Sequence, residues 1–276
     1  MVSINKVCKH PLILFAFVGF ITDVYATDNK ESDWTMTIGA AGIYSPTFQG
    51  SKSYNFSIVP DLRFNYRNDF FASVPEGIGY NIINRPKGQS GWKIGPIAKI
   101  KFERDEDDGK NIFSVWGNGN NLNGMGDVDT AFEFGGFIDY QWNKIQARIE
   151  PRRGFGGHNG IIINAKVNYN DNAGPLRFSF GPRLTWANRE YNQTYFGVNN
   201  IQSANSGLEV YYPGDGLVSY GFGVFAMMPI TYSLVVNVFS GYDLLGIQAK
   251  DSSFIKKYGL ENQFSLGVGF SYRFEL

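Results

Sequence analysis

The sequence contains few of the residues on which disulfide-bonded proteins and most hydrolases depend. Of its 276 residues, one is cysteine and two are histidine, and charged residues make up 18%, below the usual share of about a quarter. Cys8 lies ahead of the first apolar run and not at its end, so it fits neither a disulfide nor a lipoprotein acceptor site. The formal net charge is zero, which leaves no strong positive field and excludes nucleic acid as a partner.

Residues 1–26 have the pattern of an export signal. Basic residues precede the apolar run 11–21, which is too short to span a bilayer as a helix. Val24 and Ala26 place small residues at the two positions that a signal peptidase reads, so we predict cleavage after Ala26. The signal removes two basic residues and one acidic residue, so the mature chain 27–276 keeps 23 basic and 24 acidic residues.

The mature chain favours strands over helices. Aromatic residues make up 16% of the sequence and there are 33 glycines, a mixture that suits sheets with tight turns. From residue 34 onward, apolar residues recur at every second position, the period of a strand with one apolar and one polar face. In the segment 55–67, Val59 alone breaks the polar face. We therefore predict an all-β fold that forms one domain, 27–276.

Eleven segments with this period are candidate strands, and most have roughly the ten residues that a tilted strand needs to cross a bilayer. They lie at 34–44, 55–67, 70–82, 92–103, 130–142, 145–153, 161–169, 176–186, 217–228, 232–243 and 261–274. Their polar faces carry charges of both signs, at Lys99, Lys101, Glu133, Asp139, Arg148, Glu150, Arg152 and Arg183. Such faces suit a hydrated lumen whose charges form salt bridges.

The connections predict which end of the barrel faces the periplasm. Tight connections lie at 141–144, 170–174 and 228–231, and long ones at 105–129, 188–216 and 244–260. Outer-membrane barrels have short periplasmic turns and longer outer loops. Counting membrane crossings back from a last strand that enters the periplasm places all three tight connections inside and all three long ones outside. Counting forward from a periplasmic start at the first strand disagrees with this by one crossing. An extra strand near 111–117 would restore agreement, so we predict an antiparallel transmembrane β-barrel of about 12 strands.

Two alternative folds fit the pattern less well. The segment 216–242 carries no charge and could be a transmembrane helix, but Gly221, Gly223 and Pro229 interrupt it, and period 2 continues on both sides of a turn. A soluble barrel with its apolar face inward is the stronger rival. With eleven or twelve strands, such a soluble barrel would enclose a wide dry cavity. A barrel that turns its apolar face to lipid has no such cavity.

Several segments carry a family resemblance. They are GAAGIYSPTFQGSKSYNFSIVPDLRFNY at 39–66, GMGDVDTAFEFGGFIDY at 124–140, GGHNG at 156–160, YFGV at 195–198, SGLEVYYPGDG at 206–216 and the closing SYRF. In these segments the chain resembles the MltA-interacting proteins, also called the MipA or OmpV family. The resemblance implies an outer-membrane barrel without known catalysis. It also implies a scaffold that joins a lytic murein transglycosylase to a murein synthase, while other members are described as antigens, adhesins or osmotically regulated porin-like proteins.

We therefore expect a non-enzymatic protein of the cell outer membrane that contacts lipid. The first hypothesis is a scaffold whose partners are a murein transglycosylase and a murein synthase in the periplasm, and this hypothesis depends on the family because the periplasmic turns are short. A small-solute porin-like channel is an alternative, although lumen charges of both signs could cross-link and close it. A surface-exposed adhesin or antigen is another, since the long loops suit adaptable contacts.

His158 is the one histidine of the mature chain, so a lipid-modifying membrane-barrel hydrolase would have to use it. It lies in the glycine-rich segment 156–160, and we interpret it as a turn residue that buries little, whose replacement by alanine changes stability by at most about 0.5 kcal/mol. The acidic run 105–108 lacks the ligand spacing of a calcium loop, and Asp127 and Asp129 suit loop capping. We predict no catalytic, cofactor-binding or metal-binding residue.

Overall fold

The computed structural model of the chain describes residues 33–86, 88–106, 114–116 and 122–275. The export signal lies outside the described residues, so cleavage after Ala26 stays a prediction.

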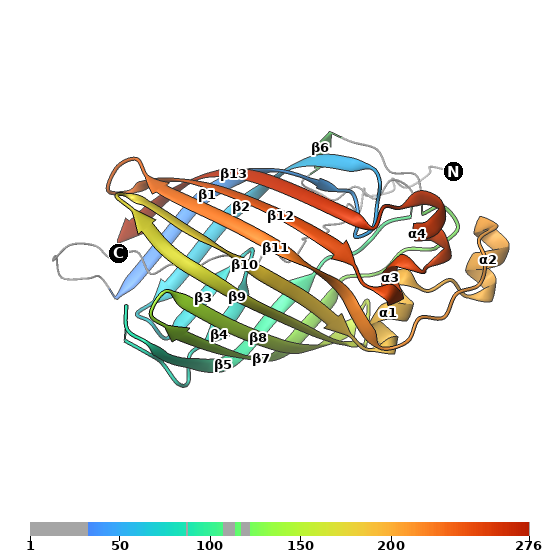
Figure 1. Cartoon of the computed structure of the whole chain (residues 1–276), viewed down its shortest axis with the longest axis horizontal. Helices are drawn as coiled ribbons and strands as arrows, with labels where there is room; N and C mark the ends of the chain where they lie inside the picture. The colour runs from blue at the N-terminus through green and yellow to red at the C-terminus, as the bar shows by residue number, and fades with distance from the viewer. Residues whose placement is uncertain (1–32, 87, 107–113, 117–121, 276) are drawn as a thin grey trace, which may run out of the picture.

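Strands make up most of the described chain, and short helices lie in the connections between them (Figure 1). The strands are β1 (Trp34–Pro46), β2 (Tyr54–Tyr66), β3 (Phe70–Ser73), β4 (Gly77–Tyr80), β5 (Gly91–Lys101), β6 (Ser114–Trp116), β7 (Ala131–Trp142), β8 (Ile145–Gly156), β9 (Ile161–Ala173), β10 (Leu176–Ala187), β11 (Gly216–Pro229), β12 (Leu234–Leu245) and β13 (Asn262–Glu275). The helices are α1 (Arg189–Phe196), α2 (Asn200–Ser206), α3 (Ile247–Lys250) and α4 (Ser253–Tyr258).

The strands form a closed antiparallel barrel. Strand β1 pairs with β2 on one side and with β13 on the other, which closes the sheet on itself. Strand β6 pairs with β2 at two positions only and stands outside the ring, so the ring contains 12 strands. The prediction of an antiparallel barrel of about 12 strands is confirmed.

The twelfth strand arises in a different place from the one predicted. The segment 70–82 is two strands, because β3 and β4 form a short hairpin that adds the missing crossing. Pro75 and Gly77 cause the reversal: Pro75 has no N–H for a ladder, and Gly77 has a φ of 87° that favours glycine. Strand β6 does lie within 111–117, but it does not complete the ring. A period of two continues through a tight hairpin, so the alternation alone did not reveal the turn.

With this hairpin counted, the tight and the long connections predicted from the sequence lie at opposite ends of the barrel. At the turn end the strands connect through 67–69, 81–90, 143–144, 174–175 and 230–233. At the loop end they connect through 47–53, 102–130, 157–160, 188–215 and 246–261. The helices lie in the last two of these connections (Figure 1). Asn143 and Gly174 have φ angles of 51° and 61°, as two-residue hairpin turns require. The predicted separation of tight and long connections is therefore confirmed.

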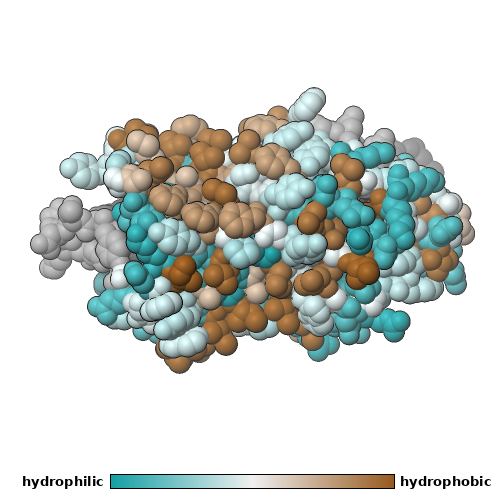
Figure 2. Space-filling model, in the orientation of Figure 1, coloured by the Kyte–Doolittle hydropathy of each residue, from teal (hydrophilic) through white to brown (hydrophobic). Residues whose placement is uncertain are grey.

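The two faces of the wall differ in polarity as the alternation predicts. On β7, Phe132, Phe134 and Ile138 point outward and are exposed, while Glu133 and Asp139 point inward and are buried. Figure 2 shows apolar side chains gathered over the strands, and hydrophilic ones toward the end that carries the helices. An apolar exterior around a polar interior is the arrangement of a barrel that contacts lipid. In the described residues, no helix has the length and apolar character needed to cross a membrane.

The larger hydrophobic core lies at the loop end, and a smaller cluster of Phe71, Ile97 and Phe137 lies on the inner faces of β3, β5 and β7. Inward-facing residues at strand ends, such as Ile162 and Val218, pack at the loop end against residues from the loops and helices. This larger cluster, which we call the loop-end cap, contains Phe48, Leu122, Met125, Val128, Ile162, Ala187, Tyr191, Tyr195, Phe196, Val198, Leu208, Val218, Leu245, Ala249, Phe254 and Ile255. Because strand ends and loops meet in one apolar cluster, the cap fills the loop-end mouth of the barrel.

The lipid-facing exterior predicts a dependence on depth. Ile138 lies in the middle of β7 and is 44% exposed, and Trp142 lies on the same face at the turn end of β7 and is 66% exposed. We expect Ile138→Arg to destabilise the folded barrel by roughly 2–4 kcal/mol and Trp142→Arg by about 0–1 kcal/mol, since a cation is costly only near the bilayer midplane. Refolding into phospholipid vesicles, followed by heat-modifiable migration in gels, measures this. Equal refolding of both variants would contradict the assigned exterior.

Candidate functional site

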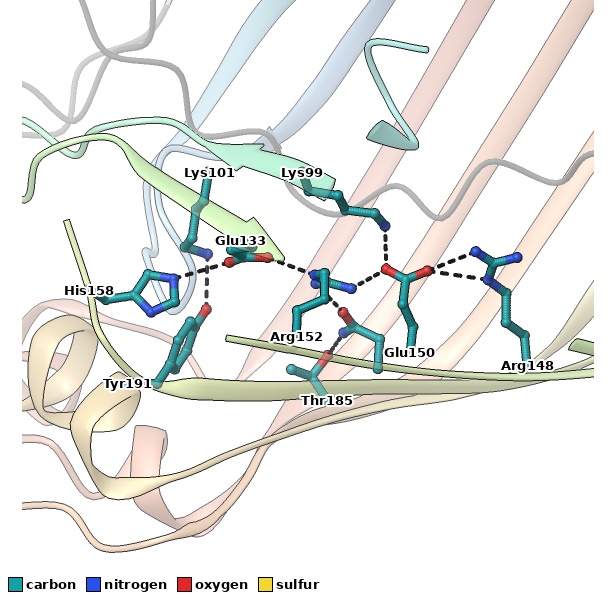
Figure 3. Close-up of polar contacts among 10 residues, drawn as sticks. Lys99, Lys101, Glu133, Arg148, Glu150, Arg152, His158, Thr185 and Tyr191 are labelled. Carbon is teal, nitrogen blue, oxygen red and sulfur yellow. Dashed lines mark hydrogen bonds and ion pairs between the residues drawn. The ribbon is translucent and has the colours of Figure 1, made fainter. Parts of the chain in front are cut away.

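Polar side chains from three neighbouring strands meet inside the barrel (Figure 3). Strand register explains part of the arrangement, because Lys99 of β5 lies opposite Glu133 of β7. Alternate residues of β8 share the inner face, which aligns Arg148, Glu150 and Arg152 along the lumen. We call Lys99, Glu133, Arg148, Glu150, Arg152 and His158 the lumen network.

Glu150 lies at the centre of the lumen network. Its carboxylate lies 2.6 Å from Lys99 Nζ and 3.0 Å from Arg148 Nη2, and it also contacts Arg152. Glu150 is buried, and an unpaired charge in a buried position is strongly destabilising. The surrounding cations therefore allow the carboxylate to remain inside the barrel.

Arg152 joins two carboxylates and extends the network to a further strand. Its Nε donates to Glu133 Oε2 at 2.7 Å, and its Nη1 contacts Glu150. Its Nη2 donates to Asn164 Oδ1 at 2.7 Å, and the Asn164 amide in turn donates to Thr185 on β10 at 2.8 Å. A planar guanidinium can make these contacts at once, which an ammonium group could not do in the same geometry.

Further ion pairs lie on the inner wall of the barrel. They join Arg63 to Asp61 at 2.7 Å, Arg85 to Asp139 at 2.5 Å and Arg183 to Asp243 at 2.5 Å. All eight charges predicted on the polar faces lie on the inner face, and the expectation that lumen charges of both signs form salt bridges is confirmed. Lys101 differs from the others, because its Nζ donates to the hydroxyl of Tyr191 at 2.9 Å. Burial raises the pKa of Tyr191 in α1, so this hydroxyl stays neutral.

His158 is buried, so its interpretation as a turn residue that buries little is wrong. Only 2% of the residue is exposed, and its Nε2 lies 3.1 Å from Glu133 Oε1. Its ring packs edge-on against the rings of Tyr191 and Tyr195. Gly154 leaves room for the ring, because a Cβ at that position would lie 2.1 Å from it. The glycines near His158 therefore reflect close packing beneath the cap.

The contacts of His158 give it a structural role. Within the described part of the chain, its ring contacts one carboxylate and two tyrosine rings, and its Nδ1 has no hydrogen-bond partner. A Ser-His hydrolase needs a nucleophilic hydroxyl within hydrogen-bond reach of the histidine. None of these contacts supplies a serine or a threonine.

The acidic residues singled out in the loop 102–130 hold its backbone together where they are described. Glu106 Oε2 accepts hydrogen bonds from the backbone N–H groups of Gly124 and Gly126, at 2.9 and 2.8 Å. Asp127 Oδ1 accepts from the N–H of Glu106 at 2.9 Å, which confirms loop capping for Asp127. Among the described residues, no three His, Cys, Asp or Glu side chains are grouped as a metal site. Asp107 and Asp108 lie outside the described residues.

The segments that carry the family resemblance meet at the loop end. Phe48, Met125, Phe196 and Leu208 come from four different segments, and all belong to the loop-end cap. His158, from a fifth segment, packs beneath the cap against α1. These five segments therefore each contribute a residue to the loop end, although they are far apart in the sequence.

The comparison with protein families identifies the relatives of this chain. The family described as MltA-interacting protein MipA matches residues 38–274. The chain belongs to this family. Its match begins in β1 and ends in β13, so it covers the whole ring. Family membership, together with the apolar exterior, supports an outer-membrane barrel protein. A search of curated proteins finds no match to the chain.

Solved structures of other barrels align with most of the chain at low sequence identity. An outer membrane channel from Pseudomonas putida F1 is 10% identical and gives a TM-score of 0.45, with 91% of this chain and 100% of that chain covered. The NanC porin is 11% identical with a TM-score of 0.43, and 85% and 98% of the two chains are covered. Neisserial surface protein A is 10% identical with a TM-score of 0.26, and 90% and 100% are covered.

Several lumen residues were not singled out from the sequence. Lys166 and Asp243 occupy inward positions of β9 and β12, so the period-2 pattern could have found them. Arg85 is different, because it lies in the connection 81–90 and has no periodic signal. Only the folded barrel brings it to Asp139.

The burial of His158 leads to a revised prediction. We expect His158→Ala to destabilise the barrel by about 1–3 kcal/mol, because buried Glu133 loses a hydrogen-bond partner. His158→Gln keeps a donor of similar reach and should cost less. Urea unfolding of the refolded proteins measures the difference. Wild-type stability of His158→Ala would show that the Glu133 contact is unimportant, whereas hydrolysis of phospholipid or lipid A that vanished in a folded His158→Ala variant would contradict the structural role.

Proposed function

We propose that this outer-membrane barrel acts by binding other proteins, and that it joins a murein transglycosylase to a murein synthase without catalysing a reaction itself. The description of the family supports this proposal, because it names an interaction with MltA. The same proposal places the turn end in the periplasm and the loop end outside the cell, as the lengths of the connections indicate.

The observation that favours binding over conduction is that the lumen is filled at one end and narrowed below it. The loop-end cap fills one mouth with apolar side chains. Below it, the lumen network places paired charges from β5, β7 and β8 inside the barrel, among them the buried Glu133, Glu150 and Arg152. A general porin instead keeps an aqueous channel open through its barrel. The outer surface and the two ends therefore remain as the sites at which partner proteins can bind.

The turn end offers more contact surface than its tight hairpins suggest. The connection 81–90 is longer than the other turn-end connections, and Ile82 within it is 71% exposed. Trp142 and Tyr232 are also exposed at this end. Large apolar side chains beside polar turns are typical anchors of protein interfaces. This surface supplies the periplasmic contact that the sequence alone did not reveal.

The experiment compares two isoleucines at opposite ends of the barrel. Ile82 and Ile201 of α2 are 71% and 72% exposed, so aspartate at either position should leave folding intact. We expect Ile82→Asp to weaken capture of the murein transglycosylase by the purified barrel by roughly thirtyfold, which corresponds to about 2 kcal/mol at an interface anchor. Ile201→Asp should capture it like wild type. No capture by wild type, or equal loss in both variants, would refute the proposed interface.

Conductance tests the closed lumen separately. The purified barrel, inserted into planar lipid bilayers, should give no steady current of porin size, because the cap and the lumen network obstruct the path. A stable, large conductance from wild-type protein would favour the small-solute channel instead.

A further inference from the structure

A cavity inside the barrel lies between the lumen network and the loop-end cap. Its volume is about 130 Å³, and its wall includes Arg148 and Glu150 from the network and Tyr191 and Leu245 from the cap. A cavity of roughly 150 Å³ can hold one benzene molecule. The space therefore suits a solute of about six non-hydrogen atoms and excludes a polymer.

Cations outnumber carboxylates in the wall of this cavity. Lys101, Arg148, Lys166 and Arg183 line it, against Glu150 and Asp243. Both carboxylates already have cationic partners: Glu150 contacts Lys99, Arg148 and Arg152, and Asp243 accepts two hydrogen bonds from Arg183, at 2.9 and 2.5 Å. The wall thus carries more positive charge than its own carboxylates balance, although the whole chain is neutral.

Lys101 shows this excess most clearly. Its Nζ donates to the neutral hydroxyl of Tyr191 and lies 4.5 Å from the ring centroid of Tyr195. Among the described residues, no carboxylate lies within ion-pair distance of it. A half-buried ammonium held by aromatic rings and a phenol is a position at which an anion would be stabilised.

A second cavity continues toward the turn end. Its volume is about 50 Å³, and it shares Arg148, Glu150 and Lys166 with the first. Its wall carries the cations Arg85, Lys93, Lys99, Arg148 and Lys166 against the carboxylates Glu76, Asp139 and Glu150. Positive side chains therefore follow one another from the turn end to the space beneath the cap, and a low-dielectric wall strengthens their field along this path.

We propose that the lumen is a binding site for a small oxyanion, a hydroxylated carboxylate or a phosphate, that enters from the turn end. Lys101, Lys166 and Arg183 would bind the anionic group beneath the cap. Thr185, Ser219 and Ser265, which also line the cavity, would hydrogen-bond its other oxygens. The cap blocks exit at the loop end, so the site retains a solute and does not conduct it. The site is independent of the proposed protein interface.

The test is calorimetric titration of the full mature barrel in uncharged detergent at low salt. The probes are lactate and inorganic phosphate, with lactamide as the neutral counterpart of lactate. We expect at least one of the two anions to bind saturably at one site, and lactamide to bind at least about tenfold more weakly, because charge-assisted hydrogen bonds supply the affinity. The preferred anion distinguishes carboxylate from phosphate as the source. No saturable binding of either anion, or equal binding of lactamide, would overturn the proposal without any variant.

Variants locate the site. Lys101→Gln and Lys166→Gln should each weaken anion binding about tenfold or more. Arg153→Gln removes one cation from the exposed outer face of β8 and should bind like wild type. Thermal unfolding checks that each variant is folded. If a variant does not fold, the comparison of lactate with lactamide binding to wild-type protein still decides whether the lumen binds an anion. An equal loss in Arg153→Gln would assign the binding to the general charge of the barrel.

Discussion

In a lipid bilayer, every backbone N–H and C=O group must find a partner within the protein, because the hydrocarbon supplies none. A sheet meets this requirement only when it closes, and here β1 closes it by pairing with both β2 and β13. Closure then fixes the rest of the molecule. Strand alternation must place apolar side chains outside and polar ones inside, and the ring of 12 strands is too wide for its interior to be filled by apolar contacts alone.

The polar interior follows from that constraint and creates a second one. Charged side chains inside the wall are far from bulk water, so they are stable only when they are paired. The lumen network satisfies this condition, because Glu150 contacts three cations and Glu133 contacts Arg152 and the ring of His158. The same pairing obstructs the lumen. Stability and closure of the path are therefore two consequences of one arrangement.

The loop-end cap supplies the larger of the two hydrophobic clusters found in the described residues. Its residues come from separate loops, and glycines let these loops approach one another closely, as at Gly154 and Gly160. Two of the segments that carry the family resemblance, GGHNG and YFGV, lie in this region. In the folded protein the loop segments pack against each other. They contact His158 and Lys101 at the loop end of the lumen.

The sequence by itself determined the fold class, the strand faces and the inward charges, because period-2 alternation is a local property that closure preserves. It also indicated the two ends, since connection length is visible without a structure. The tertiary structure alone decided that 70–82 is a hairpin, since a tight reversal does not interrupt the alternation. It alone decided the partners of each charge and the burial of His158. These depend on which strands lie opposite one another and on loops that meet only when the ring is closed, and no local pattern encodes those distances.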